Sequence, residues 1–287
     1  MNTRNWPIRA KLVALVLIPV VSLIALWGIA TQLAYGAAHD LLTAQVNHDE
    51  ATRPTGTLVV ELQQERRLSL VFLGSNRPGS DDLTAQRART DLAVASFRSH
   101  ARGDTLRADA NQATLDRLDL ALDALGRLSP IRQAVDLRQL DRAGALKSYS
   151  GIIDEAYHIY LALPVVNHPD ISRDSHAVIA ASRAREVLSQ EDALLRGIAT
   201  AGKFAGSEPA QLAGVIGTQR FLLADALVEL PRTDRDGYTA VLDAQPAARV
   251  RSLEDKLLSD ARAGAAVPVD MVAWQTSYDL YADQLRQ

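Results

Sequence analysis

Two adjacent arginines, Arg66 and Arg67, lie in a largely apolar stretch that the residue spacing predicts to be a helix over 57–76. On a helical wheel at about 100° per residue, Arg66 falls in the middle of an apolar arc, whereas Arg67 lies beside Val60 and Val71. A guanidinium keeps its charge in a protein, so each of these groups must meet an anion, a carboxylate or water. Planar guanidinium groups also match the planar oxygens of a small oxyanion. The pair therefore predicts a site that receives a small anion. The alternative is that both side chains extend outward to water or pair with carboxylates.

Two further charged residues point toward apolar arcs in the second part of the chain. On a predicted helix over 175–201, Glu191 falls among apolar residues. On the next predicted helix, over 207–230, Arg220 falls inside the apolar stripe, which makes it a third candidate anion ligand. An alternative explains the same pattern: Arg66, Arg220 and Glu191 form buried ion pairs that only set the register of the helices.

Composition and motifs exclude several classes of function. The chain has 287 residues and a net charge of −3, so no broad basic surface is indicated and nucleic acid is not an expected partner. It contains no cysteine, which excludes disulfides, cysteine nucleophiles and thiolate metal sites. The histidines show no metal-ligand spacing, and no phosphate loop, nucleophile elbow or paired-carboxylate pocket is visible. We therefore expect no enzyme activity, no catalytic residue, no cofactor and no metal in this chain.

Helices must position the arginine pair, because the whole chain has the pattern of an all-α protein. Only 5% of the residues are aromatic, and glycine and proline fall mostly between periodic segments. No strand-like alternation is long enough to indicate a sheet, and short loops predict antiparallel neighbouring helices. Besides the helices above, the spacing predicts helices over about 81–101, 111–127, 142–163, 238–244, 247–263 and 268–287, and a short one that begins at Ser129.

Residues 12–38 form an uncharged, apolar segment of about 27 residues, long enough to cross a bilayer as a tilted helix. Arg4, Arg9 and Lys11 precede it, so the positive-inside rule predicts that residues 1–11 are cytoplasmic and the rest is exported. We therefore expect a retained transmembrane helix that places the protein in the cell membrane with the remainder extracytoplasmic. A cleaved signal peptide is the alternative.

An internal repeat divides the exported part into two halves. The segment QQERRL at 63–68 has an echo, SQEDAL, at 189–194. Each segment lies in a predicted helix that ends in a glycine-containing turn, and each turn leads into another helix. The offset of about 126 to 127 positions predicts two similar helical halves, 39–166 and 167–287.

The first of these elements, VVELQQERRLSLVFLGS, resembles the opening motif of the nitrate- and nitrite-sensing domain, known as the NIT domain. QRARTDLAVASFR resembles the start of that family's following helix, with Thr90-Asp91 as the recognisable pair. EVLSQEDALLRGIATAGKF resembles the corresponding element of the second half, so the resemblance covers about residues 40–285. It implies two up-down four-helix bundles arranged end to end, with arginines near the bundle junction that hold a small oxyanion.

The resemblance also implies which residues bind the anion. Arg66 and Arg67 match the motif position directly, and Arg196 is the counterpart of an arginine in the second half. The helical wheel places Arg196 on the polar side of its helix, and Asp192 and Ala193 stand where Arg66 and Arg67 stand in the first copy. The candidate ligands are thus Arg66, Arg67, Arg196 and Arg220.

The role implied by the resemblance is the extracytoplasmic sensing region of a membrane signal-transduction receptor. Such a region binds nitrate or nitrite and signals by a rearrangement of helices. Such a domain lies outside the cell in sensor histidine kinases of the actinobacterial type, so we expect a two-component sensor histidine kinase as the parent, with a kinase region beyond residue 287. A chemoreceptor is the alternative parent. We also expect a homodimer. A different class of function stays open, namely a structural or dimerising protein-interaction module with no small-molecule ligand.

Overall fold

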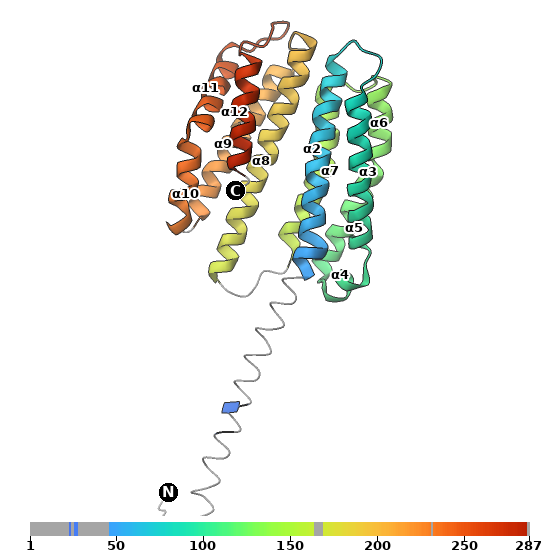
Figure 1. Ribbon diagram of the computed structural model, residues 1–287, viewed down its shortest axis with the longest axis vertical. Coiled ribbons are helices and arrows are strands. Elements are labelled where there is room, and N and C mark those ends of the chain that lie inside the picture. The colour runs from blue at the N-terminus through green and yellow to red at the C-terminus, as the bar shows by residue number, and fades with distance from the viewer. Residues whose placement is uncertain (1–22, 24–25, 28–45, 164–168, 231, 286–287) are drawn as a thin grey trace, which may run out of the picture. The chain divides into compact units, whose positions relative to one another are not determined.

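The computed structural model describes residues 23, 26–27, 46–163, 169–230 and 232–285 (Figure 1). These residues form helices joined by turns and loops, and none of them lies in a strand, so the predicted all-α fold class is confirmed for them. The chain divides into one unit of residues 1–46 and a second unit of residues 47–287. All of the helices described below lie in the second unit.

The helices follow one another with short connections. A π-helical segment, η2 (Asn47–Thr52), leads into α2 (Arg53–Gly74). The first half of the unit continues with α3 (Asp81–Ala101), α4 (Asp104–Asp109), α5 (Gln112–Gly126), α6 (Leu128–Asp136) and α7 (Arg142–Ala162). The second half contains α8 (Pro169–Ala201), α9 (Glu208–Glu229), α10 (Arg232–Asp243), α11 (Gln245–Asp260) and α12 (Met271–Gln284).

Local sequence signals explain where these helices begin. The Ser80 side chain accepts a hydrogen bond from the Leu83 N–H at the start of α3, and Asp141 caps α7 in the same way. Helix α2 begins at Arg53 rather than at the predicted residue 57. Pro54 lies in its first turn, where the missing proline N–H leaves no helical hydrogen bond unmade, so it starts the helix instead of breaking it.

The two halves stand side by side, with α8 next to α2 (Figure 1). The two helices run parallel, because Gln63 on α2 hydrogen-bonds Glu186 on α8 and, further along both helices, Gly74 meets Gly197. The predicted end-to-end arrangement of bundles is therefore wrong for the described residues. Each half uses one long helix to cover the other, so apolar side chains of α2 and α8 are buried along a shared lateral interface.

This packing follows the internal repeat. When the chain is shifted by about 126 positions, the buried residues Leu212, Ile216 and Leu223 of α9 coincide with the buried residues Gln86, Thr90 and Phe97 of α3. The contact between Gln63 and Glu186 joins residues 123 positions apart, which is close to the same offset. Structurally equivalent turns of α2 and α8 thus face each other.

Helices α2 and α8 approach closely at two glycines. A Cβ atom on Gly74 would lie 2.3 Å from the carbonyl oxygen of Gly197. A Cβ atom on Gly197 would lie 2.9 Å from the carbonyl oxygen of Leu70. Backbone atoms cannot move aside as a flexible side chain can, so both positions require glycine at this packing distance.

The predicted membrane anchor receives no support. No helix in the described part of the chain is long and apolar enough to span a bilayer. Of the predicted segment 12–38, the structure describes residues 23 and 26–27, and the remainder lies outside the described residues, as do residues 1–11 and the predicted boundary at 166–167. The expected cell-membrane location, which rested on this segment and on the basic residues before it, is therefore not supported.

The glycine contact predicts a clear difference between two glycine-to-alanine substitutions. Gly74→Ala should lower the free energy of unfolding by about 1–3 kcal/mol, because the new methyl group overpacks the interface of α2 and α8. Gly151→Ala is the control, since a Cβ atom on this residue of α7 meets nothing within 4 Å. It should raise the stability by about 0.4–1 kcal/mol. Urea denaturation measures both, and equal effects of the two variants would contradict the close approach.

Candidate functional site

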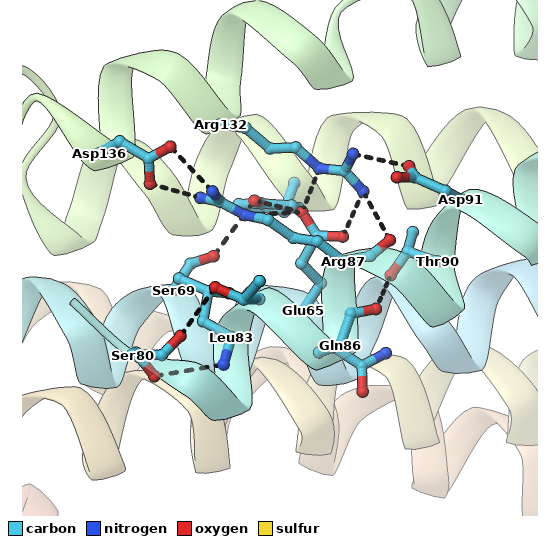
Figure 2. A network of polar contacts seen from close by, with 12 residues as sticks. Glu65, Ser69, Ser80, Leu83, Gln86, Arg87, Thr90, Asp91, Arg132 and Asp136 are labelled. Atoms are coloured by element: carbon cyan, nitrogen blue, oxygen red, sulfur yellow. Dashed lines mark hydrogen bonds and ion pairs between the residues drawn. The ribbon is translucent and has the colours of Figure 1, made fainter.

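Glu65, which precedes the arginine pair, is the centre of a buried polar network in the first half (Figure 2). Arg132 of α6 donates to both of its carboxylate oxygens at 2.8 Å. The Tyr149 hydroxyl of α7 donates to Oε1 at 2.8 Å. Burial and the nearby Glu65 charge raise the pKa of Tyr149, so the hydroxyl keeps its proton and remains a donor. These bonds give both carboxylate oxygens of Glu65 hydrogen-bond donors, and they connect α2 to α6 and α7.

Arg132 itself is held from both sides, as Figure 2 shows. Its NH1 donates to Asp91 of α3 at 2.7 Å while its other nitrogens hold Glu65. Burial alone would lower the pKa of Arg132, but the hydrogen bonds to Glu65 and Asp91 raise it. Sequence reasoning missed this network because it followed the cations of α2 and not the carboxylate beside them. The available signal was Glu65 itself, an ionisable residue on the same largely apolar helix as Arg66 and Arg67.

Arg66 points the other way, into the interface with the second half, and is fully buried. Its guanidinium pairs with Glu186 of α8, and NH2 also lies 3.2 Å from Glu186 Oε2. Ser150 of α7 accepts a hydrogen bond from NH1 at 2.9 Å, and Ser189 of α8 accepts one from NH2 at 3.1 Å. The predicted core-facing position of Arg66 is confirmed. Arg66 is paired with a carboxylate of the protein, that of Glu186, as the alternative explanation predicts. The Nε of Arg66 has no hydrogen-bond acceptor among the described residues.

Arg67 is half-buried and makes no hydrogen bond or ion pair with a described residue. Its charge acts on Asp192 of α8 and on the Tyr278 hydroxyl of α12, lowering the pKa of each against the larger effect of burial, which raises it. Arg67 therefore lies near both groups without holding either. Arg67 is thus a cation without a carboxylate partner among the described residues.

A cavity of about 390 Å³ opens between α2, α7, α8 and α12, beside the Arg66 ion pair. Its polar wall includes side chains from all four helices: Gln63, Gln64, Tyr160, Arg185, Ser189 and Tyr278. Ser189 joins the cavity to the arginines, because the same hydroxyl that accepts from Arg66 lines the cavity. The polar residues of the wall carry amide, hydroxyl and guanidinium groups, which are the kinds of group that hydrogen-bond an oxyanion.

The other two predicted ligands, Arg196 and Arg220, differ in their position relative to Arg66 and Arg67. Arg196 is linked to the surroundings of Arg67, since its Nε donates at 2.8 Å to Asp192, a carboxylate whose pKa the Arg67 charge lowers, although neither Arg196 nor Asp192 lines the cavity. Trp274 also donates to Asp192, at 3.0 Å. Arg220 is not linked to Arg67 in this way. Its guanidinium pairs with Glu254 and Asp255 of α11, within the second half.

The chain is similar to known proteins of one family. A family model described as nitrate and nitrite sensing, NIT, matches residues 57–287, which include all four candidate arginines. A search of the curated proteins finds no match. Among solved structures, the chain is similar to one entitled "Structure of the NasR transcription antiterminator", with a TM-score of 0.65 and 20% sequence identity. That likeness covers 89% of this chain and 70% of the other, and it shows a shared fold.

Glu191, predicted to face the core, is fully buried, but neither of its carboxylate oxygens has a hydrogen-bond partner among the described residues. Burial, followed by the charges of Glu254 and Asp192, raises its pKa well above the ordinary value, and Arg220 only partly opposes this. The ion pairs of Arg66 and Arg220 are made by Glu186 and Glu254 instead. Glu191 is thus a buried acid that keeps its proton.

This acid predicts a pH dependence of stability. The folded chain retains a proton on Glu191 that the unfolded chain releases above pH 4.5, its ordinary pKa. The contribution of Glu191 to the free energy of unfolding is therefore greatest below that pH and is lost as the pH rises toward the folded pKa. Glu191→Gln is neutral at every pH, so its stability should fall less than that of the parent between about pH 5 and pH 8.

Urea denaturation across this pH range measures the difference. The matched control is Glu50→Gln, a half-buried glutamate of η2 that lies outside the second half. The profile of Glu50→Gln is the reference against which the effect of Glu191→Gln is compared. A Glu191→Gln profile that runs parallel to that of the parent would show that Glu191 is ionised in the folded chain.

Proposed function

Because the chain belongs to the nitrate and nitrite sensing family, we propose that it is the sensing region of a signalling protein, in which a small oxyanion such as nitrate or nitrite binds between α2 and α8. The observation that carries this proposal is Arg67. It is a half-buried guanidinium with no hydrogen bond or ion pair among the described residues, and it lies next to the buried Arg66 on a cavity-lining helix.

The balance of charge at this interface favours an anion. Among the candidate ligands, the three guanidinium groups of Arg66, Arg67 and Arg196 share two buried carboxylates, those of Glu186 and Asp192. Asp279 reaches Arg196 only at 3.7 Å, and its side chain is 64% exposed, so solvent screens its charge. One positive charge of this set is therefore left without a buried counterion, and a bound monovalent anion would be that counterion.

The proposed signal is an exchange of partners on Arg66. Nitrate and the Glu186 carboxylate are both planar and carry one negative charge, so they compete for the same guanidinium edge. An anion that takes this edge releases Glu186, which is also held by Gln63 at 2.7 Å and by Gln190 at 2.9 Å. Release of Glu186 removes a bond between α2 and α8, and the packing of the two halves shifts.

The class of signalling protein that would contain this sensing region is a second part of the proposal. A sensor histidine kinase as the parent stays a prediction, and the matched residues, 57–287, do not test it. The alternative of a protein-interaction module without a small ligand gains from the Glu186 ion pair, since Arg66 is compensated within the chain. Direct binding measurements separate the two functions.

The first measurement removes the unpaired cation. Arg67→Gln should weaken nitrate binding at least about tenfold, or 1.4 kcal/mol, in titration calorimetry of the full chain in chloride-free buffer. The reason is that the binding site then loses its one positive charge without a buried counterion. Arg98→Gln is the matched control, because Arg98 of α3 is also half-buried without a described ion pair but lies outside the interface. Equal affinities of Arg67→Gln and Arg98→Gln would contradict the site.

The second measurement removes the competitor. Glu186→Gln keeps the shape of the side chain but not its charge, so nitrate should bind Arg66 more tightly, by roughly tenfold if the full competition is relieved. Glu254→Gln serves as control, since it removes the equivalent partner of Arg220 in the second half. It should leave nitrate affinity as in the parent. An unchanged affinity in Glu186→Gln would mean that the anion does not use Arg66.

A further inference from the structure

Helix α9 leaves one apolar face uncovered. Phe221 is 67% exposed and Val228 is 72% exposed, although both are large apolar side chains. The same face continues along the helix through small residues that are also exposed: Ala210, Gly214, Gly217 and Ala224. The opposite face, with Leu212, Ile216 and Leu223, packs into the second half. The exposed face is therefore additional to the one that the fold itself uses.

The spacing of the exposed residues is that of a coiled-coil seam. Ala210, Gly214, Gly217, Phe221, Ala224 and Val228 follow one another at alternating intervals of four and three, which are the a and d positions of successive heptads. Over this stretch the seam is roughly 27 Å long at 1.5 Å per residue. Such a strict repeat on an outer face is the pattern by which two helices pack along each other, and not the broader arc that covers a core.

The two glycines of the seam serve no need of the chain's own fold. A Cβ atom on Gly214 or Gly217 would meet nothing within 4 Å, and neither residue has a positive φ. Each costs a helix about 0.8–1 kcal/mol relative to alanine. Their absent side chains do, however, allow the backbone of another helix to come close to α9, with Phe221 and Val228 as the larger contacts.

The first half provides an internal comparison. At the repeat offset, three of the six seam positions correspond to charged residues, Asp91 and Arg98 of α3 and Arg102 just after it, and the other three correspond to Thr84, Ala88 and Ala95. The equivalent outer face of the first half therefore carries charges at positions where the α9 face has none. The lack of charge is specific to α9, so it does not follow from the shared fold.

We propose that this face, the α9 seam, binds the α9 seam of a second copy of the chain in a parallel, two-fold symmetric dimer. The argument for a second copy is charge complementarity at the edges of the seam. Arg220 lies directly before a seam residue, and Asp225 follows the next one, so they occupy g and e positions. In a parallel pair the g residue of one helix faces the e residue of the next heptad on the other. Arg220 of each copy thus meets Asp225 of its partner.

Both of these side chains are accessible for that contact. Asp225 is exposed and makes no hydrogen bond or ion pair with a described residue. The Arg220 side chain is 36% exposed and already pairs with Glu254 and Asp255 of its own chain, so Asp225 of the partner joins this cluster as a third carboxylate at its exposed side. An antiparallel pair would instead place Asp225 near Asp225 and Arg220 near Arg220, so the charges favour the parallel orientation.

Sedimentation velocity of the full chain, over concentrations from about 1 to 100 µM, tests for the dimer, because an interface of this length lies at the small end of specific interfaces. We expect reversible dimerisation in the parent and a monomer in Phe221→Glu. Leu92→Glu is the matched control: Leu92 is 74% exposed on α3, so the same new charge on the first half should leave the dimer intact. Circular dichroism checks that both variants keep their helices.

Disulfide trapping tests the orientation, and the chain suits it because it has no cysteine of its own. Gly217→Cys should give a covalent dimer on mild oxidation, since d positions face each other in a parallel pair. Leu92→Cys should stay monomeric under the same conditions. A parent that is monomeric throughout, or a dimer that survives Phe221→Glu, would overturn the proposal. A dimer that Phe221→Glu dissolves but Gly217→Cys does not trap would overturn its parallel orientation.

Discussion

A guanidinium that cannot lose its proton and cannot reach water must pair with a carboxylate or a bound anion. The interface between the two halves of this protein depends on such a pairing. Arg66 is fully buried between α2, α7 and α8, and Glu186 supplies the charge that permits its burial. Removal of either partner leaves the other as an uncompensated buried charge. The parallel packing of α2 and α8 therefore depends on whatever compensates Arg66.

Helix α2 packs against both halves, and two neighbouring residues, Glu65 and Arg66, each bind one of them. Glu65 is bound by Arg132 and Tyr149 of the first half, whereas Arg66 is bound by Glu186 of the second. The two clusters differ in how completely they are satisfied. Both oxygens of Glu65 accept hydrogen bonds, but Arg66 keeps an unbonded Nε, and the adjacent Arg67 has no described carboxylate. The first half is thus tied firmly to α2, and the interface with the second half is the part open to change.

Much of the fold could be predicted from helical periodicity and turn residues, because these act over a few neighbouring positions. The burial of Arg66 followed from its place on the wheel, and the repeat predicted two similar helical halves. The partners of the buried charges could not be read from the sequence. Glu186 lies 120 positions from Arg66, and Arg132 lies 67 positions from Glu65, so only the packing of the halves selects them. The end-to-end arrangement came from the family resemblance, and local patterns could not correct it because they do not say along which side two bundles meet.

The most direct test of the account is a crystal structure of the chain grown in the presence of nitrate, compared with one grown in its absence. The account predicts a planar anion at the interface of α2 and α8, in contact with the guanidinium groups of Arg67 and Arg66, with Glu186 displaced from Arg66. An interface without an anion, in which Arg66 and Glu186 remain paired in nitrate as they are here, would contradict it.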